Sequence, residues 1–353
     1  MSSGKLNRPG KEQYKTMKTI LVIGREGRLA QYTADKNRLD QYNIRYVPVG
    51  STDEQLLAAA KDAFCIIADA IGDVSGNVIE HMPNLRLIHS EGVGYQGIDI
   101  EAADKKGVYV CNCKGMNAAA VAEQTLLLML GLLRDAACGD RSVRDGHQIE
   151  TKENFMMSGS LKELGECTVG LVGFGDIAKA TAKLLSAFGA EVVYYKPHRL
   201  EETEEAKYGV RYMELDDMLA YSDIISLHLP ANDATRYMAG REFFSKMKNS
   251  AYLINTSRGE LVNSRDLVKA LENGIIAGAG LDTIDGEPVT ADNTLLDISE
   301  EAGRKLFLSC HIGGITGASF RRGYDMIWSD IDKVISNQAP DNIVNNPASS
   351  TSV

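Results

Sequence analysis

Three side chains in the second half of the sequence have the types needed to reduce a 2-oxo acid. Arg258, Glu287 and His311 occur in the motifs Ser-Arg-Gly, Gly-Glu-Pro and Cys-His-Ile-Gly-Gly. A guanidinium binds a carboxylate and the adjacent carbonyl oxygen in one fork, and an imidazole transfers a proton near neutral pH. A carboxylate beside the imidazole fixes its tautomer and favours its charged form. Together the three predict reduction of a 2-oxo acid, provided that a hydride donor binds beside them.

A glycine-rich loop, Gly-Phe-Gly-Asp-Ile-Ala, precedes all three and lies between a predicted strand and a predicted helix. Gly173 permits a tight turn, and Gly175 lets the backbone approach a pyrophosphate. Asp176 and Ile177 begin the helix, whose free N–H groups and dipole favour an anion. The alanine in the third glycine position is tolerated by this fingerprint. A βα turn without a ligand is the alternative, but the strand–helix context favours a dinucleotide site.

The next predicted strand ends in Tyr-Tyr-Lys-Pro-His-Arg, and this ending bears on the choice of cofactor. Dinucleotide folds usually carry an acid there, which accepts hydrogen bonds from the ribose hydroxyls. Lys196 occupies that position here, and His198 and Arg199 follow it. These donors can hold a 2′-phosphate, which favours NADP(H). A solvated basic turn that leaves NAD(H) usable is the alternative.

Further motifs resemble those of the D-isomer-specific 2-hydroxyacid dehydrogenase family, and they occur in the order found in that family. The resemblance extends from about residue 19 to residue 345. The motifs lie at 91–99, 117–123, 228–235, 253–262, 280–288 and 310–314. The sequence departs from the family pattern at Lys196, at Thr283, where valine is usual, and at Cys310, where proline precedes the histidine. The spacing from Glu287 to His311 is also longer than usual.

The resemblance implies a role for each matching residue. Arg258 binds the substrate carboxylate and polarises the carbonyl, while His311 contacts the substrate and transfers the proton with Glu287 as its partner. The backbone amides of Val93 and Gly94 bind the same carboxylate, as successive N–H groups in a glycine-rich loop can. The implied cofactor-side positions, with Asp282 near the nicotinamide amide, are His228, Pro230, Thr235, Thr256, Asp282 and Gly313.

Short β-branched runs alternate with helical patterns, which predicts an α/β fold of two Rossmann-like βαβ domains with parallel sheets. The resemblance implies an active-site cleft between them. We expect residues 1–117 and 318–353 to form a flavodoxin-like substrate domain, and residues 118–317 to form the domain that binds the nicotinamide dinucleotide. The predicted strands are 19–23, 44–48, 65–68, 86–89, 108–110, 169–172, 192–195, 224–227, 252–254, 275–278 and 306–308. The predicted helices are 53–61, 118–134, 176–188 and 319–336.

Composition narrows the class of protein. The chain has 353 residues, is 44% hydrophobic and carries a net charge of −10, which argues against a nucleic-acid partner. The longest apolar stretch, 125–133, is too short to cross a bilayer, and the polar residues 1–19 lack the apolar core of a secretory signal. We expect a cytoplasmic protein without a membrane partner. Its six cysteines form no C-x-x-C pair, so we expect reduced thiols and no metal.

The sequence also allows an alternative function and supports several smaller expectations. A nicotinamide-sensing regulatory protein of corepressor type, which shares the fold and has little turnover, is the alternative to an enzyme. A homodimer is expected, because the family pairs through the long helix and its flanks and the run 125–133 is strongly apolar. We interpret Arg25 and Arg28 as solvated and residues 340–353 as a frayed tail. The sequence does not specify which 2-hydroxy acid is used.

Overall fold

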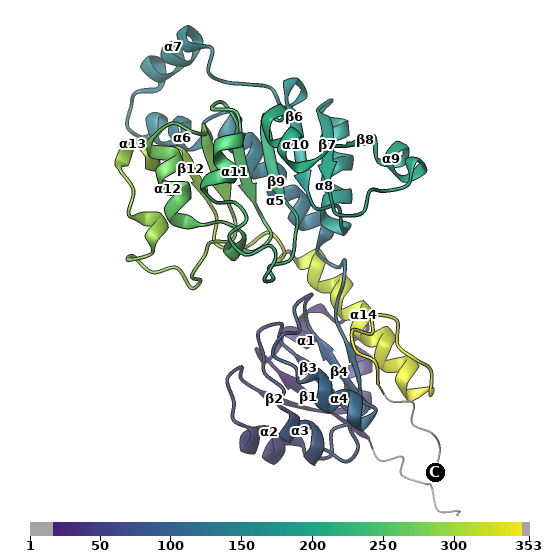
Figure 1. The fold of residues 1–353 in the computed structure, drawn as a ribbon. Coiled ribbons are helices and arrows are strands. Elements are labelled where there is room, and N and C mark those ends of the chain that lie inside the picture. The colour runs from purple at the N-terminus through teal and green to yellow at the C-terminus, as the bar shows by residue number, and fades with distance from the viewer. Residues whose placement is uncertain (1–16, 348–353) are drawn as a thin grey trace, which may run out of the picture. The chain divides into compact units, whose positions relative to one another are not determined.

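The computed structural model describes residues 17–347 as two α/β units, shown in Figure 1. Unit 1 holds the described residues up to Met116 and from Phe320 onward, and unit 2 spans Asn117–Ser319. Residues 1–16 and 348–353 lie outside the described residues, and with them most of the polar N-terminal stretch and the end of the polar tail. Every strand pair in the two main sheets is parallel, so the predicted α/β class with two parallel sheets is confirmed.

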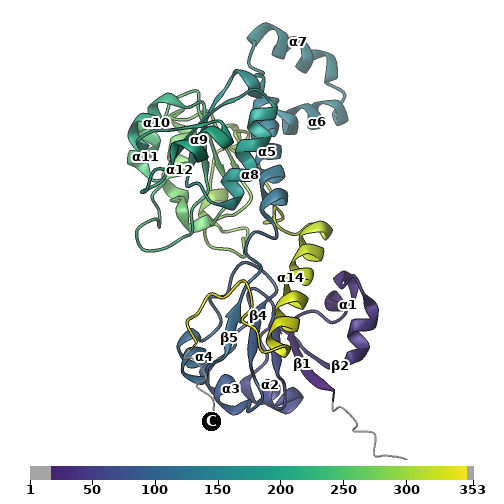
Figure 2. The same ribbon diagram turned by 90° about the vertical axis from the view of Figure 1, so that its right-hand side faces the viewer.

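Unit 1 is built on a five-stranded sheet in the order β2-β1-β3-β4-β5, the order of flavodoxin-like folds. Its strands are β1 (Lys18–Ile23), β2 (Tyr42–Val47), β3 (Cys65–Ala68), β4 (Leu87–Ser90) and β5 (Tyr109–Cys111). Its helices are α1 (Arg28–Tyr32), η1 (Lys36–Gln41), α2 (Asp53–Ala60), α3 (Gly76–His81), α4 (Ile100–Lys106) and the part of α14 (Gly317–Ile335) from Phe320 onward. Figure 2 shows this unit from the side of α14.

Helices cover both faces of the unit 1 sheet, which explains its continuously apolar strands. Leu21 and Ile23 of β1 pack with residues of α2, α3 and α4. Their neighbours Ile20 and Val22 point to the other face and pack with residues of α1 and α14. Because successive side chains alternate between faces, a strand buried on both sides must be apolar at every position.

Unit 2 is built on a seven-stranded sheet in the order β12-β11-β10-β9-β6-β7-β8. Its strands are β6 (Thr168–Val172), β7 (Glu191–Tyr195), β8 (Val210–Tyr212), β9 (Ile224–Leu227), β10 (Tyr252–Asn255), β11 (Gly278–Leu281) and β12 (Leu306–Leu308). The chain builds outward from β6 in both directions, so the strand order reverses between β6 and β9. In open parallel sheets, ligands bind beyond the carboxyl ends of the strands at such a switch point.

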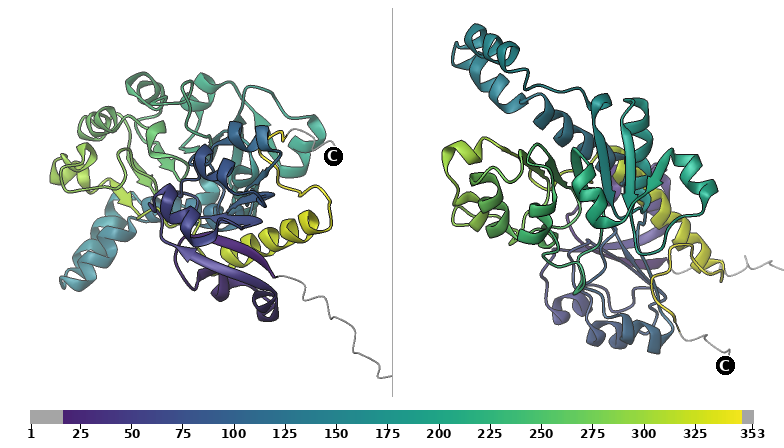
Figure 3. Two further views of the ribbon diagram at one scale, coloured as in Figure 1. Left: turned by 90° about the horizontal axis from the view of Figure 1, so that it is seen from below. Right: turned by 45° about the horizontal axis from the view of Figure 1, so that its top comes forward.

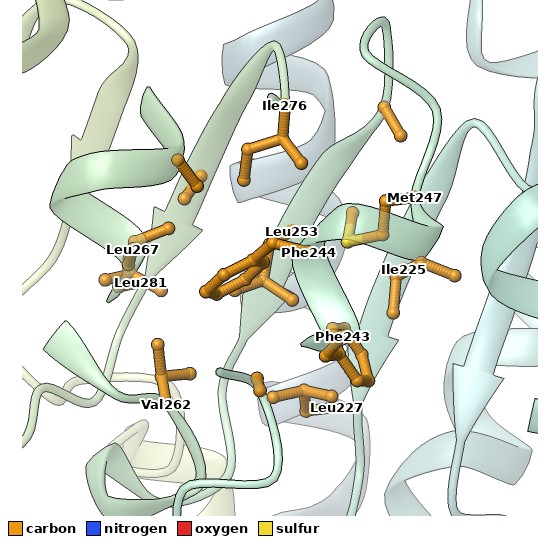
Figure 4. Packing of buried hydrophobic residues seen from close by; sticks show 14 of the residues in the cluster. Ile225, Leu227, Phe243, Phe244, Met247, Leu253, Val262, Leu267, Ile276 and Leu281 are labelled. Carbon is orange, nitrogen blue, oxygen red and sulfur yellow. The ribbon is translucent and has the colours of Figure 1, made fainter. Parts of the chain in front are cut away.

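The helices of unit 2 also form two layers. One layer consists of α5 (Ala118–Leu133) and α8 (Asp176–Ala187), which pack on Leu171 and Ile254 of the sheet. The other consists of α10 (Leu215–Tyr221), α11 (Arg241–Lys246) and α12 (Ser264–Glu272). In Figure 4, Phe243 and Phe244 of α11 lie against Leu227 and Leu253 of the sheet.

Unit 2 contains further helical segments, most of them short. They are α6 (Ala136–Arg144), α7 (Gln148–Ser158), η2 (Leu164–Glu166), α9 (Glu202–Tyr208), η3 (Gly259–Leu261), η4 (Thr294–Leu296) and α13 (Glu300–Gly303). Figure 3 shows α6 and α7 as an arm that extends from the end of α5, and neither helix has a buried residue. No helix in the described part of the chain has the length and apolar character needed to cross a bilayer.

The strand predicted at 275–278 is wrong, because β11 spans Gly278–Leu281. Its sequence, Gly-Ala-Gly-Leu, has little β propensity. Small residues are required there by packing: a Cβ on Gly280 would lie 3.0 Å from the Cβ of Leu128 on α5, and one on Gly278 would lie 2.7 Å from the carbonyl oxygen of Lys305. Close approach of neighbouring elements therefore decides the register of this strand.

The expectation of a frayed tail is also wrong for the residues that the structure describes. Val344 donates its N–H to the carbonyl of Val110 at 2.9 Å, and Asn345 accepts from the N–H of Val110 at 2.8 Å. The Asn345 side chain also donates to Asp104 at 2.8 Å. These residues form hydrogen bonds with backbone groups at the edge strand β5 that would otherwise lack a partner. The polar composition of the segment does not reveal such contacts.

Candidate active site

His311 and Glu287 form a hydrogen-bonded pair at the carboxyl edge of the unit 2 sheet. Glu287 lies in the loop after β11, and His311 lies in the loop after the neighbouring strand β12. The Nδ1 atom of His311 lies 2.6 Å from Oε2 of Glu287, whose Oε1 accepts the N–H of Ile284 at 2.8 Å. Because a carboxylate only accepts, Nδ1 carries the proton and Nε2 faces outward. The imidazole is 50% exposed, so a substrate can reach it.

The backbone of His311 has a left-handed conformation, with φ of 57°. This conformation is uncommon for a residue other than glycine and costs on the order of 1 kcal/mol, so the surrounding structure must hold it. The N–H of His311 donates to the carbonyl of Asp282 at 2.9 Å. A Cβ at Gly313 would lie 2.9 Å from Oδ2 of Asp282, which explains the glycine that follows.

Asp282 anchors the loop that carries His311. Its side chain is almost fully buried, and its Oδ1 accepts from the Ser309 hydroxyl at 2.6 Å and from the N–H of Ile312 at 3.0 Å. Its Oδ2 accepts from the N–H of Gly313 at 2.8 Å. The Gln124 side chain donates to the Ser309 hydroxyl at 2.9 Å. Sequence reasoning does not find Ser309, because its partners lie far away along the chain.

Arg258 follows β10, the next strand of the same sheet edge. A Cβ on Gly259 would lie 2.2 Å from the carbonyl carbon of Ile284, so only glycine lets this loop lie against the one that leads to Glu287. The exposed guanidinium of Arg258 donates to the carbonyl of Ser257 at 2.8 Å. Within residues 17–347 it has no acidic partner. Its remaining N–H groups are therefore available to an anion.

The glycine-rich loop joins β6 to α8 at the switch point of the unit 2 sheet. Gly173 has φ of 93°, and a Cβ there would lie 2.3 Å from the carbonyl oxygen of His228. A Cβ on Gly175 would meet nothing within 4 Å, so the space above it is open. Ala178 is fully buried between helix and sheet. With the free N–H groups of the first turn of α8, which begins at Asp176, this loop fits a pyrophosphate.

His228 and its neighbours line the loop after β9, beside the glycine-rich loop. The Nε2 atom of His228 lies 2.9 Å from the Ser226 hydroxyl, while Nδ1 is buried without a partner among the described residues. Burial lowers the pKa of His228 to about 4, so the ring is neutral at physiological pH. Thr235 donates its hydroxyl to the carbonyl of Pro230 at 2.7 Å and thereby closes the loop. Thr256 pairs its hydroxyl with the one on Thr125 of α5 at 2.8 Å.

The basic turn after β7 is only partly free to bind a phosphate. Arg199 donates from Nε and Nη2 to the two carboxylate oxygens of Glu205, each at 2.8 Å. Tyr194 donates its hydroxyl to the same carboxylate at 2.7 Å. Lys196 is partly buried and His198 is exposed, and neither has a partner in the part of the chain that the structure describes. The structure therefore separates Arg199 from the other two basic residues of this turn.

In unit 1, the loop after β4 presents two free backbone N–H groups. Three successive carbonyl oxygens accept hydrogen bonds within the unit: Gly92 from the Cys113 N–H (2.8 Å), Val93 from the Asn112 side chain (2.7 Å) and Gly94 from the Ser90 hydroxyl (2.5 Å). The N–H groups of Val93 and Gly94 have no acceptor among residues 17–347. With its carbonyls held elsewhere, this loop can bind an anion through those two N–H groups.

Arg28 is not solvated as expected, because two carboxylates of unit 1 bind it. Its Nη1 atom lies 2.7 Å from Oδ2 of Asp69 and also contacts Oε2 of Glu91. Arg25 is exposed, in agreement with its interpretation. All six cysteines are free. Across the described ranges, no group of three or more His, Cys, Asp or Glu side chains is arranged to hold a metal ion.

Comparisons with known proteins agree with this geometry. The model of the D-isomer specific 2-hydroxyacid dehydrogenase NAD binding domain matches residues 126–313. A glyoxylate reductase from Thermofilum pendens is 34% identical over 292 residues, which cover 83% of this chain and 84% of the relative. A D-3-phosphoglycerate dehydrogenase from Mycobacterium tuberculosis is 33% identical over 82% of this chain but only 52% of its own length.

Solved structures of 2-hydroxyacid dehydrogenases are also similar to this chain. The NAD complex of a D-isomer specific 2-hydroxyacid dehydrogenase from Lactobacillus delbrueckii ssp. bulgaricus has a TM-score of 0.77 at 27% identity and covers 93% of this chain and 100% of that chain. D-lactate dehydrogenase from Aquifex aeolicus, complexed with NAD and lactic acid, has a TM-score of 0.77 at 26% identity, with 94% and 100% coverage. The chain therefore belongs to the D-isomer specific 2-hydroxyacid dehydrogenase family.

Proposed function

We propose that this chain reduces a short 2-oxo acid to the D-2-hydroxy acid with a nicotinamide nucleotide. As a member of its family it is a nicotinamide-dependent oxidoreductase that interconverts 2-oxo and 2-hydroxy acids. The observation that carries the proposal is the pair of His311 and Glu287, which share one sheet edge with Arg258. The alternative of a regulatory protein with little turnover has no support, because the matched relatives are named as enzymes.

In the proposed mechanism, each of these three side chains has its own role. Arg258 binds the substrate carboxylate and polarises the 2-oxo group. His311 donates the proton from Nε2 to the oxygen that becomes the hydroxyl, and Glu287 stabilises the imidazolium before the transfer. A bound reduced nicotinamide supplies the hydride to C2 of the substrate. In unit 1, the free N–H groups of Val93 and Gly94 form a position that can bind an anion.

A small substrate is supported by the relatives that cover most of this chain. Those from Thermofilum pendens and Thermococcus litoralis are both named glyoxylate reductase, and both are 34% identical to it. The D-3-phosphoglycerate dehydrogenases match over only about half of their own length, so their substrate is a weaker guide. We therefore propose that glyoxylate and similar short 2-oxo acids are reduced.

The cofactor proposal favours NADP(H), with NAD(H) as a usable second cofactor. Lys196 has no acidic partner among the described residues and stands where dinucleotide folds usually carry an acid. His198 is a second free donor in the same turn, whereas Arg199 is bound by Glu205. The proposal therefore depends on Lys196 and His198, with fewer donors than the sequence alone indicates.

A homodimer is proposed, with α6 and α7 as the contact. The apolar run of α5 does not supply surplus surface, because unit 2 buries most of it and Leu127 is the exposed exception, at 52%. In contrast, Val143 of α6 and Ile149, Met156 and Met157 of α7 are all more than half exposed. Apolar side chains gathered on a projecting arm indicate a partner surface, and a second copy is the commonest partner. We also infer a reducing compartment, the cytoplasm, from the six free thiols.

Steady-state turnover on a panel of 2-oxo acids tests the proposal. Glyoxylate, pyruvate and longer 2-oxo acids would each be supplied with NADH and with NADPH, while the absorbance of the reduced nicotinamide is followed. We expect turnover with at least one short acid and formation of the D product where the product is chiral. The absence of turnover with every acid and both cofactors would refute the proposal and favour the regulatory alternative.

A further inference from the structure

Two consecutive residues of α5, Gln124 and Thr125, each contact a loop of unit 2 that carries a side chain of the candidate active site. The Gln124 side chain donates to the Ser309 hydroxyl at 2.9 Å, and Ser309 lies two residues before the imidazole of the site. The Thr125 hydroxyl lies 2.8 Å from the hydroxyl of Thr256, which lies two residues before the guanidinium. One turn of one helix therefore contacts both loops.

Gln124 contacts the His311 loop on both sides of the imidazole. Because a carboxylate only accepts, the Ser309 hydroxyl donates its proton to Asp282 at 2.6 Å and accepts from Gln124. After the imidazole, a Cβ on Gly313 would lie 3.3 Å from both Cβ and Cγ of Gln124, so the glutamine side chain packs directly against the loop. The loop is thus attached to α5 two residues before and two residues after His311.

Thr125 contacts the Arg258 loop through a hydrogen bond whose direction is fixed. Thr125 is fully buried, and its hydroxyl donates to the carbonyl of Val121 in the preceding turn of α5 at 2.8 Å. A hydroxyl has one proton to donate, so the Thr256 hydroxyl donates to Thr125. Thr256 is also buried, and a buried donor that loses its acceptor is destabilised. This contact therefore holds the start of the Arg258 loop against α5.

We propose that Gln124 and Thr125 are positioning residues, which hold His311 and Arg258 in their reactive geometry from one turn of α5. This inference rests on the proposed function, because it assigns both residues to the same reaction. The two loops follow β12 and β10, on either side of β11, and α5 packs directly on β11. Adjacent residues of a helix point about 100° apart, so two of them can reach two loops. A displacement of about 1 Å at reacting groups can lower a rate strongly.

The first part of the test removes the contact to the His311 loop. Gln124→Met keeps the length and the helix propensity of the side chain but removes the donor. It should lower kcat for 2-oxo acid reduction about tenfold with little change in KM, because it acts on the proton donor. Ser309→Ala should also lower kcat. In the Ser309→Ala background, Gln124→Met should have little further effect, because the hydroxyl that Gln124 contacts is already absent.

The second part removes the contact to the Arg258 loop. Thr125→Val replaces the hydroxyl with a methyl group of similar size. It should raise KM for the 2-oxo acid about tenfold at saturating reduced nicotinamide, because it acts on the arginine that binds the substrate carboxylate. Thr125→Ser keeps the hydroxyl and should keep KM near that of the natural protein. If Thr125→Val does not fold, Thr125→Ala removes the same hydroxyl without adding volume.

Thr181→Val is the matched control for a loss of stability. Thr181 is fully buried in α8 and donates to the carbonyl of Ile177 at 2.9 Å, the same bond to the preceding turn that Thr125 makes. Within residues 17–347, no second hydroxyl contacts it. Thermal unfolding should show similar losses of stability for Thr181→Val and Thr125→Val. Only Thr125→Val should change KM, and a merely structural role would not produce this difference.

The outcomes distinguish this inference from the proposed function. If folded Gln124→Met and Thr125→Val reduce the 2-oxo acid with the constants of the natural protein, α5 does not position the two loops, and the function stands. A loss of activity that Thr181→Val shares also contradicts the inference, because it would follow from stability alone. If the natural protein reduces no 2-oxo acid, the proposed function fails, and this inference fails with it.

Discussion

The imidazole of His311 and the carboxylate of Glu287 lie 2.6 Å apart, on loops that follow two neighbouring strands of one parallel sheet. The other oxygen of Glu287 is held by the backbone N–H of Ile284, so the carboxylate has a fixed direction. His311 has a left-handed backbone that Asp282 helps to hold. Both partners are therefore positioned by their own loops, and this arrangement leads to the first two predictions.

The first prediction concerns proton transfer by His311. His311→Ala should lower kcat for 2-oxo acid reduction by about 100- to 10,000-fold, the usual contribution of a general acid, because alanine cannot transfer the proton. Binding of the reduced nicotinamide, followed by fluorescence, should change little. His147→Ala, in the exposed histidine before α7, is the matched control. Near-normal turnover by His311→Ala would show that another group donates the proton.

The second prediction concerns the hydrogen bond between Glu287 and His311. The carboxylate accepts from Nδ1 of His311 and so fixes the orientation of the ring. Glu287→Gln replaces this charge-assisted hydrogen bond by a weaker one and should lower kcat about tenfold or more, with little change in KM. The amide preserves the shape of the side chain, so folding should be retained. An unchanged kcat would show that His311 does not depend on this hydrogen bond.

The third prediction concerns the carboxylate-binding role of Arg258. Lysine keeps the positive charge but loses the two-pronged geometry of the guanidinium, so Arg258→Lys should raise KM for the 2-oxo acid about tenfold or more. Arg241→Lys, at the exposed start of α11, tests for a general effect of the substitution. Initial-rate measurements over a range of substrate concentrations give both constants. If KM and kcat both stay unchanged, another cation binds the carboxylate.

The fourth prediction concerns cofactor choice at the turn after β7. The natural protein should use NADPH more efficiently than NADH by about tenfold, the effect of one charge-assisted contact to the 2′-phosphate. Lys196→Asp should reverse this preference. Glu205→Gln should increase it, because Arg199 would be released from its carboxylate partner. A natural protein that prefers NADH, or a preference that Lys196→Asp leaves unchanged, would refute the assignment to NADP(H) but not the enzyme class.

The fifth prediction concerns the arm formed by α6 and α7. Sedimentation velocity should show a dimer, and the double change Met156→Glu with Met157→Glu should shift it toward the monomer by placing charges in an apolar contact. Lys152→Glu adds a charge to the same helix without removing apolar surface and serves as the control. A natural protein that sediments as a monomer at every concentration would contradict the prediction.

Much of the candidate site is predictable from the sequence because its chemistry is carried by short motifs. Arg258, Glu287 and His311 each follow a strand. Glycine or proline adjoins Arg258 and Glu287, and Gly313 lies two residues after His311. The structure places Glu287 and His311 in contact. The loop at Gly173 is similarly local, since a strand, a tight turn and a helix are adjacent in the chain. The parallel α/β class follows from alternating patterns that each span only a few residues.

The sequence by itself thus determined the α/β fold class and indicated the candidate reacting groups and the candidate nucleotide loop. Only the tertiary structure decided which charges and hydrogen-bonding groups are satisfied. Asp282 is used to hold the His311 loop, Arg199 is bound by Glu205, and Arg28 is shared by Asp69 and Glu91. These partners come from different elements, and a contact between them depends on how strands and helices pack. Local pattern carries no information about such distant pairs, because the free energy of each pair arises only after folding brings the two groups together.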